Sequence, residues 1–83
     1  MYLTDYCPYC RMAERLLQAK GVEHIEKIRV DLEPALRSEM IRRTRRRTVP
    51  QIYIGEVHVG GFDELSALDR AGRLEQMLRG DAA

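Results

Sequence analysis

The sequence has only two cysteines, no tryptophan and no long apolar run. Two cysteines cannot supply the closed ligand shell of a structural zinc site, and His24 and His58 lie outside any recognisable ligand spacing. No stretch is long enough to span a membrane, and the N-terminus runs into Tyr2-Leu3-Thr4 without a signal peptide. We therefore expect no metal, no bound cofactor and no membrane association.

The charge balance is also unremarkable, because the net charge is only +1. This value gives no general preference for nucleic acid or another polyanion. The length of 83 residues predicts a single domain over 1–83, ending in a frayed tail at 80–83. We expect a monomer in the reducing cytoplasm, where a pair of nearby cysteines is catalytic or metal-binding rather than structural.

Both cysteines fall in one segment, Cys7-Pro8-Tyr9-Cys10. Proline is favoured at the first position of a helix, and Met12, Ala13, Leu16 and Leu17 follow at helical spacing on one face. This pattern places Cys7, exposed, at the helix N-cap and Cys10 about one turn in and more buried. The free N–H groups and the dipole of the helix start stabilise a thiolate there.

The spacing of the two cysteines favours redox chemistry. A thiolate at Cys7 would attack a substrate disulfide, and Cys10 would then attack the Cys7 sulfur and resolve the mixed disulfide. A purely structural disulfide is a weaker interpretation, because so small a loop removes little entropy from the unfolded chain. A zinc site is weaker still for the reason given above.

The rest of the chain alternates strand and helix signals. Extended segments are predicted at 1–5, 22–30, 48–54 and 57–59, and helices at 8–20, 34–44, from 64 onward and at 73–78. Leu36, Met40 and Ile41 should face inward from the second helix, and Leu65 and Leu68 from the third. Gly55-Glu56 predicts a hairpin turn, Asp63 a helix N-cap and His58 a solvent-facing side chain.

Five arginines occur within Arg42–Arg47, interrupted only by Thr44. A nucleic-acid interface is one interpretation, but no aromatic residues interleave with the run. A solvated helix end and loop is an alternative. In a third interpretation, one or two of these arginines bind the carboxylates of an acidic thiol substrate.

Three motifs together resemble the glutaredoxin family. They are Cys7-Pro8-Tyr9-Cys10, Thr48-Val49-Pro50 and Gly60-Gly61-Phe62-Asp63-Glu64-Leu65, in the order and spacing of that family. The resemblance covers essentially the whole chain and matches the dithiol class. It implies an α/β thioredoxin fold: a four-stranded mixed sheet flanked by helices in the order β-α-β-α-β-β-α, here with a short C-terminal helix. The order of elements read along the chain is the same.

The resemblance also implies a site for glutathione as reductant. Cys7 would form the mixed disulfide, with Tyr9 lining the groove and Thr48 and Val49 pairing with the cysteinyl part. Pro50 would be cis. The γ-glutamyl end would be held at Gly61, Phe62 and Asp63, and the glycyl carboxylate by Arg46 or Arg47.

Two positions depart from the family pattern. Thr4 stands where a lysine is common, three residues before the nucleophile, and Arg45 stands where a glycine is often found. The first removes a cation near Cys7, for which Arg11 could compensate. The second changes the loop and its charge.

These observations predict a glutathione-dependent thiol–disulfide oxidoreductase. Its partners would be glutathione and proteins that carry disulfides or glutathione mixed disulfides. Two alternatives remain: a redoxin of the same fold that is reduced by a flavoprotein, and a module that holds an iron–sulfur cluster between subunits through Cys7 and glutathione. A nucleic-acid module rests on the arginine run alone.

Overall fold

The computed structural model describes residues 1–79. The elements are β1 (Tyr2–Leu3), α1 (Pro8–Ala19), β2 (Ile28–Arg29), α2 (Pro34–Thr44), β3 (Ile52–Ile54), β4 (Val57–Gly60), α3 (Phe62–Arg70) and α4 (Leu74–Leu78). This order confirms the predicted one. The predicted tail at 80–83 lies outside the described residues. Within residues 1–79, no helix is both long and apolar enough to cross a membrane.

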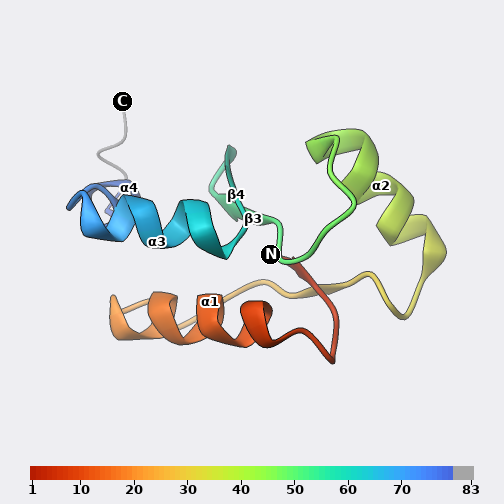
Figure 1. The fold of residues 1–83 in the computed structure, drawn as a ribbon, viewed down its shortest axis with the longest axis horizontal. Coiled ribbons are helices and arrows are strands. Elements are labelled where there is room, and N and C mark those ends of the chain that lie inside the picture. The colour runs from red at the N-terminus through yellow and green to blue at the C-terminus, as the bar shows by residue number, and fades with distance from the viewer. Residues whose placement is uncertain (80–83) are drawn as a thin grey trace.

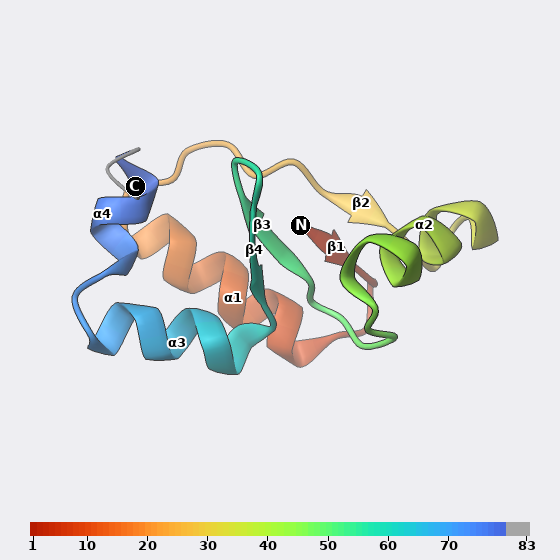
Figure 2. The same cartoon turned by 90° about the horizontal axis from the view of Figure 1, so that it is seen from above.

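The strands form one mixed arrangement of two pairs. β1 pairs in parallel with β2, and β3 pairs antiparallel with β4. Tyr2 and Gln51 join the two pairs through reciprocal backbone hydrogen bonds of 2.9 and 3.1 Å. The spatial order is therefore β2-β1-β3-β4, with the strands running through the middle of the molecule (Figure 2).

The strands are shorter than the sequence predicts. The extended segment expected at 48–54 contributes only Ile52–Ile54 to β3, and Gln51 adds a single bridge to β1. Pro50 has no N–H to donate to a ladder, and the Val49–Pro50 peptide bond is cis, as the resemblance implied. Thr48, Val49 and Pro50 form a loop that faces the start of α1.

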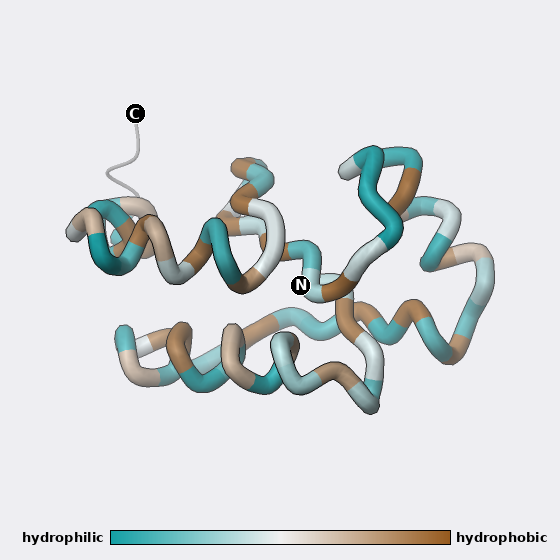
Figure 3. Tube along the Cα trace, in the orientation of Figure 1, coloured by the Kyte–Doolittle hydropathy of each residue, from teal (hydrophilic) through white to brown (hydrophobic). Residues whose placement is uncertain are grey.

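Helices cover both faces of the strands. α1 and α3 lie side by side on one face, and α2 covers the other (Figures 1 and 2). The buried side chains on the first face are Met1, Ala13, Leu17, Ile52, Leu65 and Leu74. On the second face they are Tyr2, Val30 and Met40, with Leu36 and Ile41 packed against them as predicted. Apolar stretches alternate with polar ones along the helices, as burial of one face requires (Figure 3).

The first helix begins as expected, with one correction. Cys7 is the N-cap in an extended conformation, and Pro8 occupies the first helical turn. Ala13 and Leu17 are buried, but Met12, predicted to face inward, is 42% exposed. Successive residues on a helix are about 100° apart, so the position before Ala13 turns toward solvent.

The end of α2 fixes the arginine-rich loop. Thr44 Oγ1 donates to the Met40 carbonyl at 2.7 Å and accepts the Arg46 N–H at 3.1 Å. Arg45 between them has φ 59°, in the left-handed region that favours glycine. Arg37 Nη2 donates to the Arg47 carbonyl at 3.1 Å. These contacts lead the chain from α2 directly into Thr48.

The start of α3 differs from the prediction. The helix begins at Phe62 with Gly61 as N-cap, whereas Asp63 was expected to be the cap. The Glu64 carboxylate accepts the Gly61 N–H at 3.3 Å, so a side chain from inside the helix satisfies this donor. Asp63 lies in the first turn, where its negative charge suits the helix dipole.

Candidate active site

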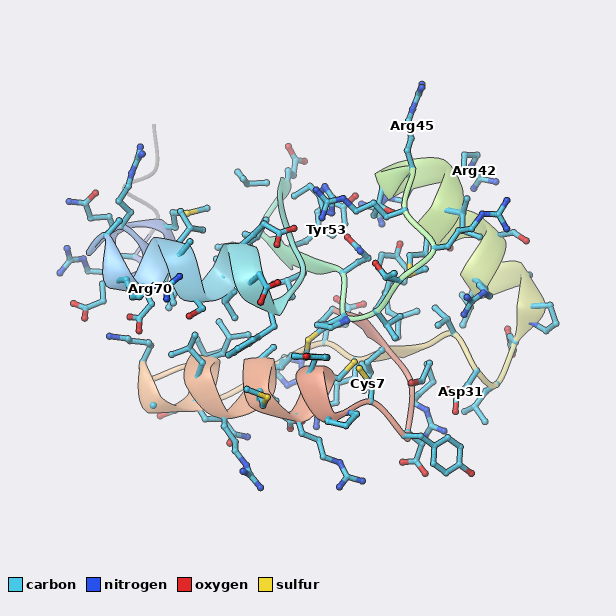
Figure 4. All side chains as sticks on the ribbon, viewed as in Figure 1. Cys7, Asp31, Arg42, Arg45, Tyr53 and Arg70 are labelled. Atoms are coloured by element: carbon cyan, nitrogen blue, oxygen red, sulfur yellow. The ribbon has the colours of Figure 1, made fainter. Side chains whose placement is uncertain are left out.

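The Cys7 sulfur lies where α1 meets the loop before β3. Its Sγ accepts a hydrogen bond from the Cys10 N–H at 3.2 Å, and its thiol donates to the Val49 carbonyl at 3.5 Å. The side chain is partly exposed, in the space between the start of α1 and that loop (Figure 4). A sulfur that accepts one of the free N–H groups in the first turn of a helix is well placed to carry negative charge.

Cys10 has a different environment, although it is only one helical turn away. It is 2% exposed. Burial raises the pKa of its thiol to about 12, and its hydrogen bond with Cys7 acts in the same direction. Cys10 is therefore a protonated thiol beneath an accessible one. Both cysteines are reduced in this structure.

A groove of about 350 Å³ opens beside this pair. One wall is the loop before β3, the other is the start of α3, and Tyr9 from α1 lies at the rim. The Tyr9 and Phe62 rings are 6.4 Å apart. The groove is lined by Tyr9, Arg46, Thr48, Val49, Pro50, Gly61, Phe62, Asp63 and Glu64.

Only one of the two arginines that the sequence offered as alternatives lines the groove. Arg46 lines the groove and forms an ion pair with Glu64, which comes from the opposite wall. Arg47 is exposed and does not line it. Among the groove residues predicted from the sequence, Arg47 is the one that the structure leaves outside.

Sequence reasoning missed Glu64 as a groove residue. Its hydrogen bond with Arg46 lowers the pKa of its carboxyl, and the Gly61 N–H adds to this effect. The available signal was a glutamate three residues after the glycine that precedes a helix, which is the spacing of a capping box.

Gly60 accommodates this pair of charges. Its φ is 115°, and a Cβ added there would lie 2.6 Å from Glu64 Oε1 and 3.1 Å from Arg46 Nη1. The positive φ would strain any other residue here, and a Cβ would require the flexible ends of Glu64 and Arg46 to shift. The backbone conformation is therefore the main reason for a glycine at this position.

Four residues near Cys7 or in the arginine run, Thr4, Tyr6, Arg11 and Arg45, do not line the groove. Tyr6 is 86% exposed and is outside the groove. Arg11 points to the Asp5 carbonyl, 3.4 Å away. Arg45 extends away from Cys7 (Figure 4). The Thr4 backbone faces the Cys10 thiol and opposes the rise in its pKa.

His58 is partly buried, whereas the sequence predicted a solvent-facing residue. Its ring centroid is 5.0 Å from that of Tyr53, and its Nε2 lies 2.8 Å from Gln51 Oε1. Burial lowers its pKa, and the nearby Arg46 charge adds to the shift. Within residues 1–79, no cluster of three or more metal-ligating side chains is present.

Comparisons with known proteins agree on one family. The sequence model of the glutaredoxin family matches residues 1–59. A glutaredoxin from Neisseria meningitidis is 53% identical over 78 residues, which cover 94% of this chain and 92% of that protein. The solution structure of Brucella melitensis glutaredoxin has a TM-score of 0.85 at 44% identity, over 99% of this chain and 88% of that one. A buckwheat glutaredoxin–glutathione complex has a TM-score of 0.87 at 32% identity, over 99% and 76% of the two chains.

Proposed function

This chain belongs to the glutaredoxin family of thiol–disulfide oxidoreductases, and we propose that it uses glutathione to reduce protein disulfides and protein–glutathione mixed disulfides. The observation that carries this proposal is the accessible Cys7 sulfur beside the groove of Tyr9, Thr48 and Gly61. A buckwheat relative has been solved as a glutathione complex, which favours the same ligand here. The proposed setting is a monomer in the cytoplasm.

In the monothiol reaction, only Cys7 reacts. Its thiolate attacks the glutathione sulfur of a mixed disulfide, a bond forms between that sulfur and Cys7, and the substrate thiolate leaves and takes up a proton. A second glutathione thiolate then attacks the glutathione sulfur bound to Cys7. Glutathione disulfide leaves and the Cys7 thiolate is restored. The hydrogen bond from the Cys10 N–H stabilises this thiolate as attacker and as leaving group.

In the dithiol reaction, Cys10 resolves the intermediate. After Cys7 has attacked a protein disulfide, the Cys10 sulfur attacks Cys7, the Cys7–Cys10 disulfide forms and the second substrate thiolate leaves. Burial and the hydrogen bond with Cys7 raise the pKa of Cys10 in the resting protein. The second of these causes weakens once the Cys7 sulfur is in a disulfide, so Cys10 gives up its proton more readily at the step that requires it. That proton passes to solvent, from which the departing substrate thiolate takes one up. Two glutathione molecules then reduce the pair.

The groove offers complementary groups for the parts of glutathione. We assign the backbone of Thr48 and Val49 to the cysteinyl part and Tyr9 to the groove edge, with cis Pro50 shaping the loop. Gly61, Phe62 and Asp63 lie at a helix start, and we assign them to the γ-glutamyl end. The Gly61 N–H is bonded to Glu64, so the donors for the γ-glutamyl carboxylate are the N–H groups of Phe62 and Asp63. Arg46 is the cation for the glycyl carboxylate.

The decisive experiment is turnover of a small glutathione mixed disulfide, coupled to glutathione reductase and NADPH. We expect glutathione-dependent turnover that Cys7→Ser abolishes. Cys10→Ser should keep deglutathionylation and lose reduction of protein disulfides. Turnover that persists in Cys7→Ser would refute the nucleophile. A wild-type protein that ignores glutathione but cycles with a flavoprotein reductase would refute the choice of reductant.

A further inference from the structure

Gln51 is a completely buried polar side chain next to the groove. It is 0% exposed, and its backbone N–H and carbonyl are both bonded to Tyr2 in β1. Its side-chain Nε2 donates to the Thr48 carbonyl at 2.9 Å and to Thr48 Oγ1 at 3.3 Å. On the other side, its Oε1 lies 2.8 Å from His58 Nε2.

These contacts determine where the protons are. The Thr48 carbonyl can only accept, so the Gln51 NH₂ group must face Thr48 and the Gln51 oxygen must face His58. His58 therefore carries its proton on Nε2 and donates to Gln51. Burial lowers the His58 pKa, and the Tyr53 ring packs 5.0 Å away, so the imidazole is neutral and held in one orientation at pH 7.

The chain of donors runs from β4 into the groove wall. His58 orients Gln51, Gln51 holds Thr48, and Thr48 lines the groove beside Val49. Without the His58 donor, the buried Gln51 oxygen would lose its hydrogen-bond partner. The amide orientation that places the NH₂ group on Thr48 would then be less strongly favoured.

We propose that His58 and Gln51 are positioning residues for glutathione, because their hydrogen bonds hold Thr48 in the orientation that the cysteinyl part of the ligand meets. This inference rests on the proposed function. Both residues act through Thr48, which lines the groove, so we expect their effect on ligand binding rather than on the reacting sulfur atoms.

The test compares His58→Phe with wild type in the glutathione mixed-disulfide assay. Phenylalanine keeps a ring against Tyr53 and removes the donor. We expect the KM for the mixed disulfide to rise about fivefold, or about 1 kcal/mol, the worth of one ordinary hydrogen bond. The kcat should stay within about twofold of wild type, as should the rate at which iodoacetamide alkylates Cys7, whose sulfur is held by the Cys10 N–H.

Two variants provide matched controls. His24→Phe makes the same substitution at the other histidine, which is exposed, and should leave the KM unchanged. Ile54→Val removes one methyl group from the core and separates positioning from simple loss of stability. The proposal is overturned if the wild type is active and His58→Phe has the same KM. It is also overturned if Ile54→Val loses as much Tm as His58→Phe and its KM rises by the same factor.

A second variant and a spectrum test the chain of donors itself. Gln51→Glu keeps an acceptor for His58 but faces the Thr48 carbonyl with an oxygen, so its KM should rise more than that of His58→Phe. The ¹⁵N spectrum of the imidazole should show the neutral Nε2–H tautomer. An Nδ1–H tautomer would overturn the proposal, and this result does not depend on whether the protein is active. Inactivity of the wild-type protein with glutathione would count only against the proposed function.

Discussion

The Cys10 N–H lies 3.2 Å from the Cys7 sulfur, and this contact links the two cysteines of the proposed redox pair. The first turn of α1 supplies a donor to the exposed sulfur from the same residue that carries the buried thiol. Any charge that develops on Cys7 is therefore stabilised by the backbone N–H of Cys10, the cysteine that we propose as its resolving partner. The two cysteines therefore differ in exposure and in the ease with which the thiol ionises, and both differences can be measured.

Alkylation should distinguish the two thiols. At pH 7.5 we expect iodoacetamide to modify Cys7 at least about 100-fold faster than Cys10, since the thiolate is the reactive form. Cys10 is 2% exposed and its pKa is raised to about 12 by burial. Peptide mapping by mass spectrometry after short exposure would give both rates. In urea the two rates should converge, and comparable rates in the folded protein would contradict the buried thiol.

Cys10 should also make the reduced protein less stable at high pH. Its pKa is about 12 in the folded state against 9.0 as the reference, so above pH 9 the unfolded chain loses a proton that the folded chain keeps. The contribution of Cys10 to stability is complete below about pH 9 and is lost as the pH rises toward 12. Between pH 9 and 10 the wild type should lose about 1 kcal/mol more than Cys10→Ala.

Urea unfolding with a non-thiol reductant at pH 8, 9 and 10 would measure this difference. The comparison of slopes removes the other groups that titrate in this range, because both proteins contain them. Parallel stability profiles for wild type and Cys10→Ala would show that Cys10 ionises as easily in the folded state as in the unfolded one.

The sequence was sufficient wherever local chemistry decides the structure. Pro8 after Cys7 predicted the helix start, and the three motifs led to residues that do surround one groove. It was insufficient where a partner comes from a distant segment. The pairing of Glu64 with Arg46, and the position of Arg46 rather than Arg47 in the groove wall, depend on how α3 meets the loop after α2.

Burial was predicted well on average and less well for single side chains. Periodicity identified the inward face of α1 but wrongly included Met12, which lies beside Ala13 at the edge of that face and is exposed. It placed His58 on the solvent side by strand alternation, yet Gln51 and Tyr53 both contact its ring. The alternation of side chains along a strand describes that strand alone, whereas the contacts of His58 come from residues in or next to the neighbouring strand β3.

Arg45→Gly should stabilise the protein. Arg45 has φ 59°, a conformation that costs an L-residue about 1 kcal/mol and costs glycine little. Glycine loses part of this gain through its more flexible unfolded state, so we expect about 0.5 kcal/mol and a rise in Tm of a few degrees. Calorimetry would measure the shift.

Arg45→Ala is the matched control, because it removes the same charge but retains a Cβ. It should show none of the gain. Equal stabilisation by alanine and glycine would assign the effect to relief of repulsion among the neighbouring arginines instead of to the backbone.

Arg46 and Arg47 provide a paired test of the groove. Both carry one positive charge in the same loop, but only Arg46 lines the groove. Arg46→Gln should raise the KM for glutathione about tenfold, because it removes a charged partner for a ligand carboxylate and leaves Glu64 without its ion pair. Arg47→Gln should change the KM less than about twofold, because Arg47 does not line the groove and its charge acts on a bound ligand only across solvent and salt.

Salt gives the same comparison a second measurement. The KM of wild type should increase with ionic strength, and that of Arg46→Gln should increase less, because the screened interaction is already absent. Similar effects of the two substitutions would mean that the loop acts through its total charge. A larger change in KM for Arg47→Gln than for Arg46→Gln would place the glycyl carboxylate outside the groove. The ion pair of Arg46 and Glu64 would then not serve ligand binding.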